Sequence, residues 1–350
     1  MTRIVDVDLH HQVADWSAVA PHVPAGLRWR FGESGPPLAR HGFKPVGAPR
    51  GERAVDPATV KTQYLDPHGI DVAILTGSLM GLGVQPNPDL AGAIARGIND
   101  WTLETWVRPF DCYRGSILIA QQDPRQAVAE IDRLGHDPGM VQVLMGSASE
   151  APFGRRAFHP IYEACVRHAL PLALHMGGEG TGISSPATAV GHPTTYFEWY
   201  GSLPQSYMAH IMSMVTEGVF ERFPSLKVVL YEAGIFWLPH VMWRFDKNWK
   251  AQRSETPWVK RAPSAYMLEH FYSTTYPLEA APRPEYLRQV LDMIDGEHKL
   301  LFSGRYPDLA LGDPFEMLVD IPESIRQRVL FDNALSVYGE RLLAGRKVAA

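Results

Sequence analysis

Eight short β-rich runs, separated by helical stretches, most constrain what this 350-residue chain can fold into. Their alternation with helices predicts a parallel sheet with crossover helices. Eight such units favour a closed (β/α)8 TIM barrel over an open doubly wound sheet, which gives no reason for the count to stop at eight. The expected strands are Arg3–Asp8, Val72–Thr76, Ser116–Ala120, Val141–Met145, Leu170–His175, Leu226–Tyr231, Phe271–Thr275 and Lys299–Ser303.

Several of the helical stretches begin with residue types that are favoured at helix N-termini. Asn87-Pro88-Asp89, Asp123-Pro124 and His159-Pro160 each place proline in the first turn, where its missing N–H costs nothing. The expected helices are Asp89–Trp106, Pro124–Leu134, His159–His168, Tyr207–Arg222, Leu238–Gln252, Pro284–Ile294 and Ser324–Leu343.

Two long stretches interrupt the alternation. Residues 16–58 are rich in Pro, Gly and Arg, and residues 177–206 begin with a glycine run and end in an aromatic cluster that includes Trp199. Loops of this length in compact domains are usually functional. We therefore expect both to elaborate the C-terminal face of a single barrel domain covering residues 1–350, with Trp199 as a substrate-binding residue.

Charge and cysteine content exclude several classes of protein. The chain has 33 Lys+Arg against 38 Asp+Glu, a formal net charge of −5, which argues against a nucleic-acid binder with a basic footprint. Its two cysteines cannot form a disulfide framework. No apolar leader or membrane-spanning stretch is visible. The expectation is a soluble cytoplasmic protein with a small-molecule substrate and neither nucleic acid nor membrane as partner.

Metal-type residues stand at the C-terminal ends of three expected strands, where barrel enzymes place their active sites. Asp8 and His10 end the first strand and share one face, because side chains alternate along a strand. The fifth and sixth strands are apolar until His175 and Glu232. An Asp-x-His pair alone would be read as a polar strand end, but its repetition around a barrel indicates a constructed site.

These residues lie in segments that resemble the amidohydrolase superfamily, specifically the branch that includes aminocarboxymuconate semialdehyde decarboxylase and benzoate-type decarboxylases. The resemblance extends over almost the whole chain. Its segments are Ile4–His10, Asn99–Trp101, Leu174–Gly178, Glu217–Pro224, Glu232–Gly234, Trp237–Pro239, Trp243-Arg244 and Asn333-Ala334.

The resemblance implies a barrel that binds one divalent ion, with zinc expected and manganese as the other candidate. It places Asp8, His10 and His175 on metal-ligand positions, and Glu232 where the decarboxylases have a catalytic histidine. It also implies a homodimer.

The eighth strand departs from the family pattern. Family members end it with Ser-Asp-Tyr-Pro-His, but here Arg305 stands in place of the aspartate and Asp308 in place of the histidine. A guanidinium has no lone pair to offer an ion and does not lose its proton. Arg305 therefore turns away while Glu232 completes the ligand set, or holds a substrate anion in the site, or neutralises Asp8 or Glu232 where the ion has been lost.

The sequence thus predicts a hydrolase or decarboxylase acting on a small aromatic or unsaturated carboxylate or carbonyl compound. Asp8, His10 and His175 would bind the ion, Glu232 and Arg305 would be catalytic, and Arg305 would also bind substrate with Trp199 and His210. His210 lies within an expected helix, so a structural role is its other interpretation. The alternative function is a metal-free cyclase, dehydratase or isomerase, or a ligand-binding protein.

Overall fold

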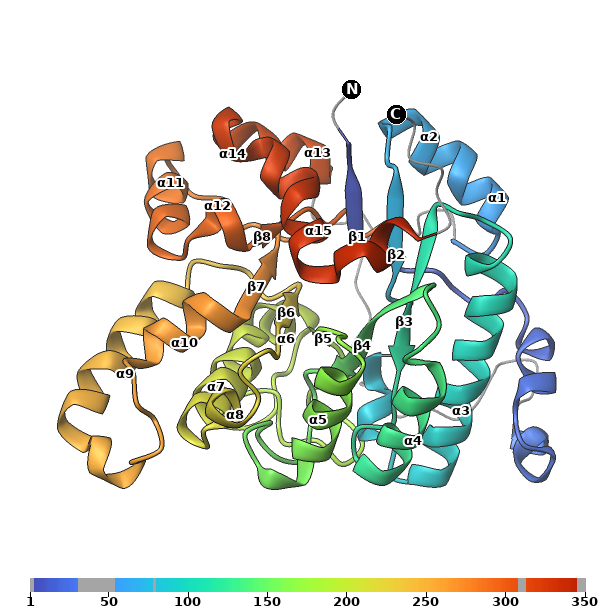
Figure 1. Ribbon diagram of the computed structural model, residues 1–350, viewed down its shortest axis with the longest axis horizontal. Helices are drawn as coiled ribbons and strands as arrows, with labels where there is room; N and C mark the ends of the chain where they lie inside the picture. Colours follow the sequence, from blue (N-terminus) through green and yellow to red (C-terminus); the bar gives the residue numbers. More distant parts are fainter. Residues whose placement is uncertain (1–2, 31–53, 78–79, 308–312, 345–350) are drawn as a thin grey trace.

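The computed structural model describes residues 3–30, 54–77, 80–307 and 313–344. Within them, eight parallel strands pair in chain order, and helices surround the sheet (Figure 1). Main-chain hydrogen bonds from Val7 to Phe302 and from His10 to Tyr306, of 3.0 and 2.9 Å, bring the end of the last strand back to the first. The sheet is therefore a nearly closed barrel, which confirms the predicted TIM-barrel fold. The strands are β1 (Val5–Leu9), β2 (Val72–Leu75), β3 (Tyr113–Leu118), β4 (Met140–Gly146), β5 (Leu172–His175), β6 (Val228–Tyr231), β7 (Phe271–Thr274) and β8 (Leu300–Leu301).

The helices that follow the strands bury apolar faces against the barrel, and their starts follow the sequence punctuation. The Asn87 side chain accepts a hydrogen bond from the Leu90 N–H, and Asp123 caps the next helix in the same way. The helices are α1 (Pro57–Val60), α2 (Asp66–His68), α3 (Pro88–Thr102), α4 (Pro124–Leu134), α5 (His159–Arg167), α6 (Tyr196–Ser202), α7 (Pro204–Thr216), α8 (Val219–Arg222), α9 (Leu238–Gln252), α10 (Pro263–His270), α11 (Pro284–Met293), α12 (Gly296–Lys299), α13 (Pro314–Met317), α14 (Glu323–Gln327) and α15 (Asn333–Tyr338).

Two expected helices are wrong because a glycine interrupts or ends them. The stretch 207–222 breaks into α7 and α8 at Gly218, which adopts a left-handed φ of +73° and has the Trp258 ring packed where a side chain would begin. The stretch 324–343 contains a π-helical segment at Arg328–Asp332, and α15 stops at Gly339, whose φ is +64°. Both stops use a backbone conformation that periodicity does not reveal.

The third and eighth strands are also shifted or shortened relative to the prediction. β3 begins at Tyr113 and ends at Leu118. It ends there because the Asn99 side chain hydrogen-bonds to both the N–H and the carbonyl oxygen of Leu118, each at 2.9 Å. β8 contains only Leu300 and Leu301, since the chain turns out of the ladder toward the barrel mouth. The eight barrel positions are nevertheless those expected from the sequence.

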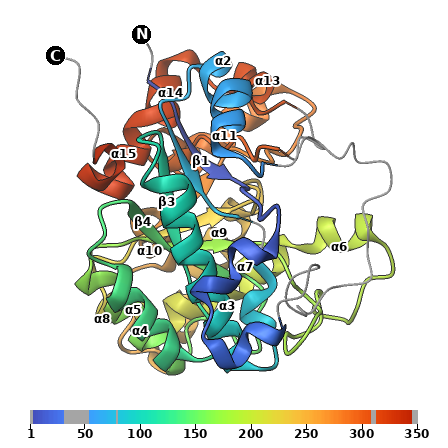
Figure 2. The same cartoon turned by 90° about the vertical axis from the view of Figure 1, so that its right-hand side faces the viewer.

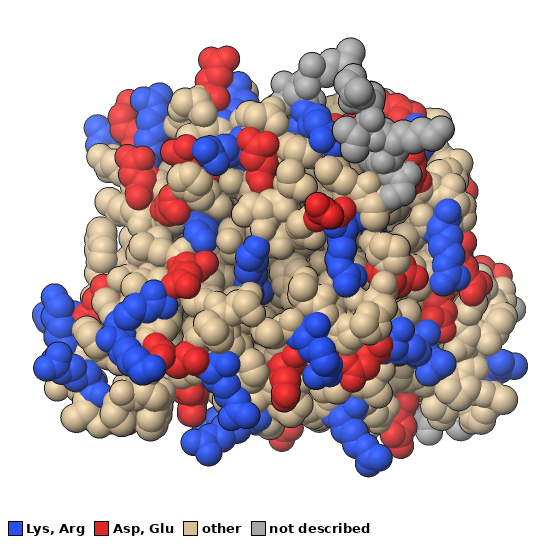
Figure 3. Space-filling model, viewed as in Figure 1, with Lys and Arg blue, Asp and Glu red and all other residues tan. Residues whose placement is uncertain are grey.

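The long stretch 177–206 forms α6 and the loops around it, and α6 lies apart from the helical layer (Figure 2). Of the stretch 16–58, residues 31–53 lie outside the described part, and Trp16–Ala18, Ala20–His22 and Ala25–Arg30 form 3-10 helices. Acidic and basic side chains are interspersed over the face shown in Figure 3. No helix in the described ranges is long and apolar enough to cross a membrane.

Candidate metal centre

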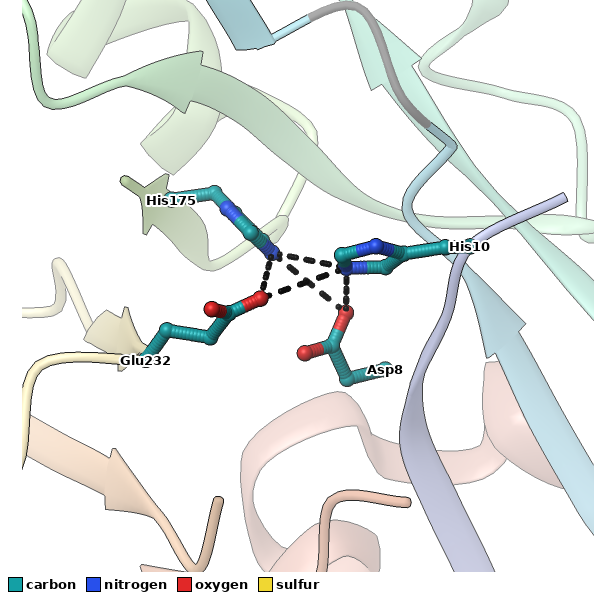
Figure 4. A group of neighbouring side chains, drawn as sticks. All are labelled: Asp8, His10, His175 and Glu232. Atoms are coloured by element: carbon teal, nitrogen blue, oxygen red, sulfur yellow. Dashed lines mark hydrogen bonds and ion pairs between the residues drawn. The ribbon is translucent and has the colours of Figure 1, made fainter. Parts of the chain in front are cut away.

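Four polar side chains from three separate strand ends meet inside the barrel mouth (Figure 4). Asp8 and His10 come from β1, His175 ends β5, and Glu232 follows β6. The Nε2 atoms of the two histidines are 3.0 Å apart. His10 Nε2 lies 3.1 Å from Asp8 Oδ1 and 3.5 Å from Glu232 Oε1, while His175 Nε2 lies 3.5 and 3.4 Å from the same two oxygens.

The spacing of these atoms suits one divalent ion. Donors placed about 2.1 Å from a central ion are about 3.4 Å apart in a tetrahedron and about 3.0 Å apart in an octahedron. The separations that involve a histidine Nε2 atom are 3.0–3.5 Å, a range that includes both of these donor–donor distances. Two imidazoles and two carboxylates are donors that zinc and manganese both accept. The residues therefore fit the divalent ion that the sequence predicts.

Neighbouring groups fix the donors in the form that binds a cation. His175 Nδ1 lies 2.8 Å from the Met176 carbonyl oxygen. Because a carbonyl only accepts, Nδ1 carries the proton, and Nε2 of the neutral ring presents a lone pair to the site. Asp8 accepts hydrogen bonds from Thr76 Oγ1 at 2.6 Å and from Ser303 Oγ at 3.2 Å. These bonds orient the carboxylate before an ion arrives.

The charges of the cluster are mutually dependent. Burial opposes ionisation of Asp8, but the adjacent His10 and His175 outweigh it and hold the pKa of Asp8 well below its usual range. Burial likewise opposes protonation of His175, yet the Asp8 carboxylate raises the pKa of His175 above its ordinary value. The carboxylates of Asp8 and Glu232 thus favour positive charge at the centre of the cluster, and a divalent ion there would take the place of the histidine protons.

Arg305 points into the site rather than away from it. Its Nε donates a hydrogen bond to Glu232 Oε1 at 2.5 Å, and both side chains are buried. Of the three arrangements expected from the sequence, the one in which Arg305 turns away is wrong. The Tyr276 ring lies 5.5 Å from the guanidinium carbon, and Tyr200 donates to Glu232 Oε2 at 3.2 Å. Asp308 lies outside the described residues.

Both members of this ion pair follow their strands with left-handed backbone. Glu232 has a φ of +53° and Arg305 a φ of +50°. Non-glycine residues pay steric strain in this region and adopt it where surrounding contacts impose it, often at functional sites. The turn directs each side chain across the barrel mouth instead of along the alternation of its strand.

Asp6 lies one layer below the four donors and joins the first strand to the last. It accepts hydrogen bonds from the N–H groups of Asp8 and Gly304 at 2.9 and 2.8 Å, and from the Tyr64 hydroxyl at 2.8 Å. A side chain on Gly304 would collide with Tyr64 and Asp6, so glycine is required for this close approach. Asp6 thus fixes the main chain at Asp8 and at Gly304, and so positions Asp8 and Arg305 at the site.

Trp199 is buried in α6, and its indole N–H binds the main chain of the loop that follows β5. Its Nε1 donates to the Glu179 carbonyl oxygen at 3.0 Å. The Glu179 carboxylate in turn accepts hydrogen bonds from the Gly177 N–H and from Ser147 Oγ. Trp199 therefore anchors α6 to the loop that follows β5, and its role in substrate binding stays a prediction.

His210 borders a cavity of about 360 Å³, which Ser147, Glu179 and Gln205 also line. Its Nδ1 accepts a hydrogen bond from the Phe153 N–H at 3.2 Å, and its Nε2 donates to the Ser147 carbonyl at 2.7 Å. Both ring nitrogens are used by main chain, which matches the structural interpretation of this residue. Substrate binding by His210 also stays a prediction.

This environment predicts a pH-dependent contribution of His210 to stability. Burial lowers the pKa of His210 to about 4, so the unfolded chain takes up its proton first as the pH falls below about 6.5. Stability is then lost with falling pH, by about 2 kcal/mol between about pH 7 and about pH 5. We expect the loss measured by urea unfolding to be smaller by about this amount in His210→Gln, which keeps a neutral donor and acceptor, than in the parent. Equal losses in both proteins would contradict the assignment.

Several residues that support the site were not identified from the sequence. Tyr200 belongs to the same aromatic cluster as Trp199, and Glu179 lies within the glycine run that begins at residue 177. Thr76 and Ser303 stand at expected strand ends, and polarity at that position is the signal that would have found them. His11, by contrast, faces away as strand alternation predicts, hydrogen-bonded to Thr102 at 2.8 Å and stacked on Trp101.

Comparison with known proteins agrees with this site and fold. The amidohydrolase family matches residues 7–339. Gamma-resorcylate decarboxylase of Polaromonas sp. strain JS666 is 26% identical over 303 residues, covering 82% of this chain and 88% of that protein. The 2-amino-3-carboxymuconate-6-semialdehyde decarboxylase of Dictyostelium discoideum is 22% identical over 288 residues, covering 80% and 76%.

Solved structures share the fold over nearly the whole chain. The 5-carboxyvanillate decarboxylase of Sphingomonas paucimobilis superposes with a TM-score of 0.70 at 21% identity, covering 97% of this chain and 99% of that one. A dihydroxybenzoic acid decarboxylase of Polaromonas sp. JS666, with bound manganese and 2-nitroresorcinol, gives a TM-score of 0.69 at 21% identity, covering 97% and 98%. The chain belongs to the amidohydrolase family, in the branch that contains these decarboxylases.

Proposed function

We propose that this protein is a metal-dependent decarboxylase of a small aromatic carboxylate. The observation that supports this most is the meeting of two imidazoles and two carboxylates, within 4.8 Å of one another, beside a buried guanidinium. The donors suit a cation and the guanidinium suits a carboxylate, so the site offers places for both ends of such a substrate. The relatives are carboxy-lyases, which favours decarboxylation over hydrolysis.

Asp8, His10 and His175 would hold the ion, with Glu232 at the edge of the set. When bound, the ion would polarise a phenolic or carbonyl oxygen of the substrate. Solved structures of two relatives hold manganese, which favours manganese over zinc among the two expected ions. Cytoplasmic location and a homodimer stay predictions.

The remaining residues orient the carboxylate and move a proton. Arg305 would pair with the substrate carboxylate in bidentate fashion. As the bond to the carboxyl carbon breaks, its electron pair stays on the ring carbon, which takes a proton while carbon dioxide leaves. Glu232 is the group placed to relay that proton: its carboxylate would take a proton from solvent once Arg305 has moved to the substrate, and pass it to the ring carbon, because Arg305 cannot release one. Tyr200 holds the second Glu232 oxygen during this transfer.

The test uses the full chain purified without chelator. We expect bound manganese or zinc by elemental analysis, and release of carbon dioxide from gamma-resorcylate or 5-carboxyvanillate. Exhaustive chelation should abolish this activity, and added Mn²⁺ should restore it. Activity that survives chelation would instead favour a metal-free enzyme, for which the Arg305–Glu232 ion pair is the supporting observation. Tight ligand binding without turnover would favour a binding protein.

A further inference from the structure

Glu232 Oε1 serves two partners at once. It accepts the Arg305 Nε hydrogen bond at 2.5 Å, and it also lies 3.4 and 3.5 Å from Nε2 of His175 and His10. The atom that would face a bound cation is therefore the atom that holds the guanidinium. This arrangement follows from Arg305 standing where the resemblance places an aspartate.

A guanidinium at this distance opposes binding of a dication. Like charges about 4 Å apart repel appreciably even at an effective dielectric constant near 20, and Arg305 is 7% exposed, so water screens the repulsion little. The carboxylate of a bound ligand beside Arg305 would weaken this repulsion and draw the guanidinium from Glu232, because planar guanidinium groups pair with carboxylates through two parallel hydrogen bonds.

Glu232 would keep its orientation when Arg305 changes partner. Its Oε2 accepts a hydrogen bond from Tyr200 at 3.2 Å, and its N–H donates to Thr274 Oγ1 at 3.3 Å. Oε1 is thereby left facing the two histidines. The hydrogen bonds from Tyr200 and to Thr274 thus hold Glu232 whether Arg305 is paired with Glu232 or with a ligand.

We propose that Arg305 couples the two ligands of this site: binding of an anionic aromatic carboxylate strengthens binding of the divalent ion, and the ion strengthens binding of the carboxylate. Arg305 exchanges Glu232 for the carboxylate of the ligand, and Glu232 is released to the ion. The identity of the anion rests on the proposed function. Linkage requires the two effects to be equal, and couplings of this kind are about 5- to 150-fold.

The experiment measures Mn²⁺ binding from the electron paramagnetic resonance signal of free Mn²⁺, without turnover. Benzoate and benzamide are the probes, because they share a ring and a shape but differ in charge. We expect benzoate to strengthen Mn²⁺ binding by about tenfold or more, Mn²⁺ to strengthen benzoate binding by the same factor, and benzamide to have little effect.

Variants separate Arg305 from direct ligation of the ion by benzoate. Arg305→Met should bind Mn²⁺ more tightly without benzoate and lose most of the benzoate effect, whereas Arg305→Lys, which keeps the charge, should retain part of it. Arg167→Met is the matched control, since Arg167 is exposed and pairs with Asp132 on the outer surface. Circular dichroism would establish that each variant is folded.

Equal benzoate enhancement in the parent and in Arg305→Met would overturn the coupling, as would equal effects of benzoate and benzamide in the parent. The outcome is distinguishable from that of the proposed function. Coupling without carbon dioxide release from any aromatic acid would leave this inference standing and contradict the decarboxylase proposal. Metal-dependent carbon dioxide release without coupling would do the reverse.

Discussion

Replacement of His175 by alanine is expected to remove the bound ion and lower decarboxylation at least about thousandfold. His175 is 1% exposed, and its Nε2 is within 3.5 Å of donor atoms from the three other cluster residues. Loss of this imidazole leaves a smaller donor set beside the Arg305 charge, and polarisation by an ion supplies several kcal/mol of transition-state stabilisation. The measurements are bound metal by elemental analysis and kcat/KM for gamma-resorcylate.

His298→Ala is the matched control for that variant. His298 is half exposed on α12 and pairs with Asp295, away from the barrel mouth. We expect it to keep both bound ion and activity. Undiminished activity of folded His175→Ala would show that the reaction does not use the four-residue cluster.

Replacement of Arg305 by aspartate is expected to strengthen Mn²⁺ binding at least about hundredfold. The change removes a positive charge next to Glu232 and adds a carboxylate, and each unit charge at about 4 Å is worth about 4 kcal/mol at an effective dielectric constant near 20. The KM for an aromatic carboxylate should rise at the same time, because the guanidinium that pairs with the substrate is gone. Titration with Mn²⁺ and steady-state kinetics measure the two effects.

The metal content of the parent protein decides how this prediction is interpreted. If the parent purifies without metal and Arg305→Asp purifies with a full complement, Arg305 has displaced the ion and the metal-free alternative gains support. If the variant binds Mn²⁺ no better than the parent, the charge of Arg305 does not act on the ion at all. Arg305→Asn, which removes the charge without adding a donor, separates the loss of repulsion from the gain of a ligand.

Much of the fold could be predicted because the positions of strands and helices follow from local patterns in the sequence. Apolar runs, helix-opening prolines and the count of eight units identified the barrel, and α4 and α9 have the predicted bounds. The errors fall where tertiary contacts decide. Gly218 breaks a helix beneath Trp258, and Asn99 of the preceding helix α3 binds the main chain of Leu118 where β3 ends.

The candidate donors could be predicted for the same reason, since Asp8, His10, His175 and Glu232 stand at strand ends and parallel strands of a barrel bring those ends together. The contacts around them could not. Thr76, Ser303 and Tyr200 reach the site from other elements, and their hydrogen bonds depend on side-chain directions that sequence spacing does not fix.

The sequence by itself determined which donor types stand at the mouth of the barrel and that a cation, Arg305, replaces the family's aspartate. Only the tertiary structure decided that Arg305 joins Glu232, which is 73 residues away in the chain. Alternation predicts side-chain direction only while a strand remains extended. Both residues lie just beyond their strands with left-handed φ angles, and the surrounding packing turns them toward each other.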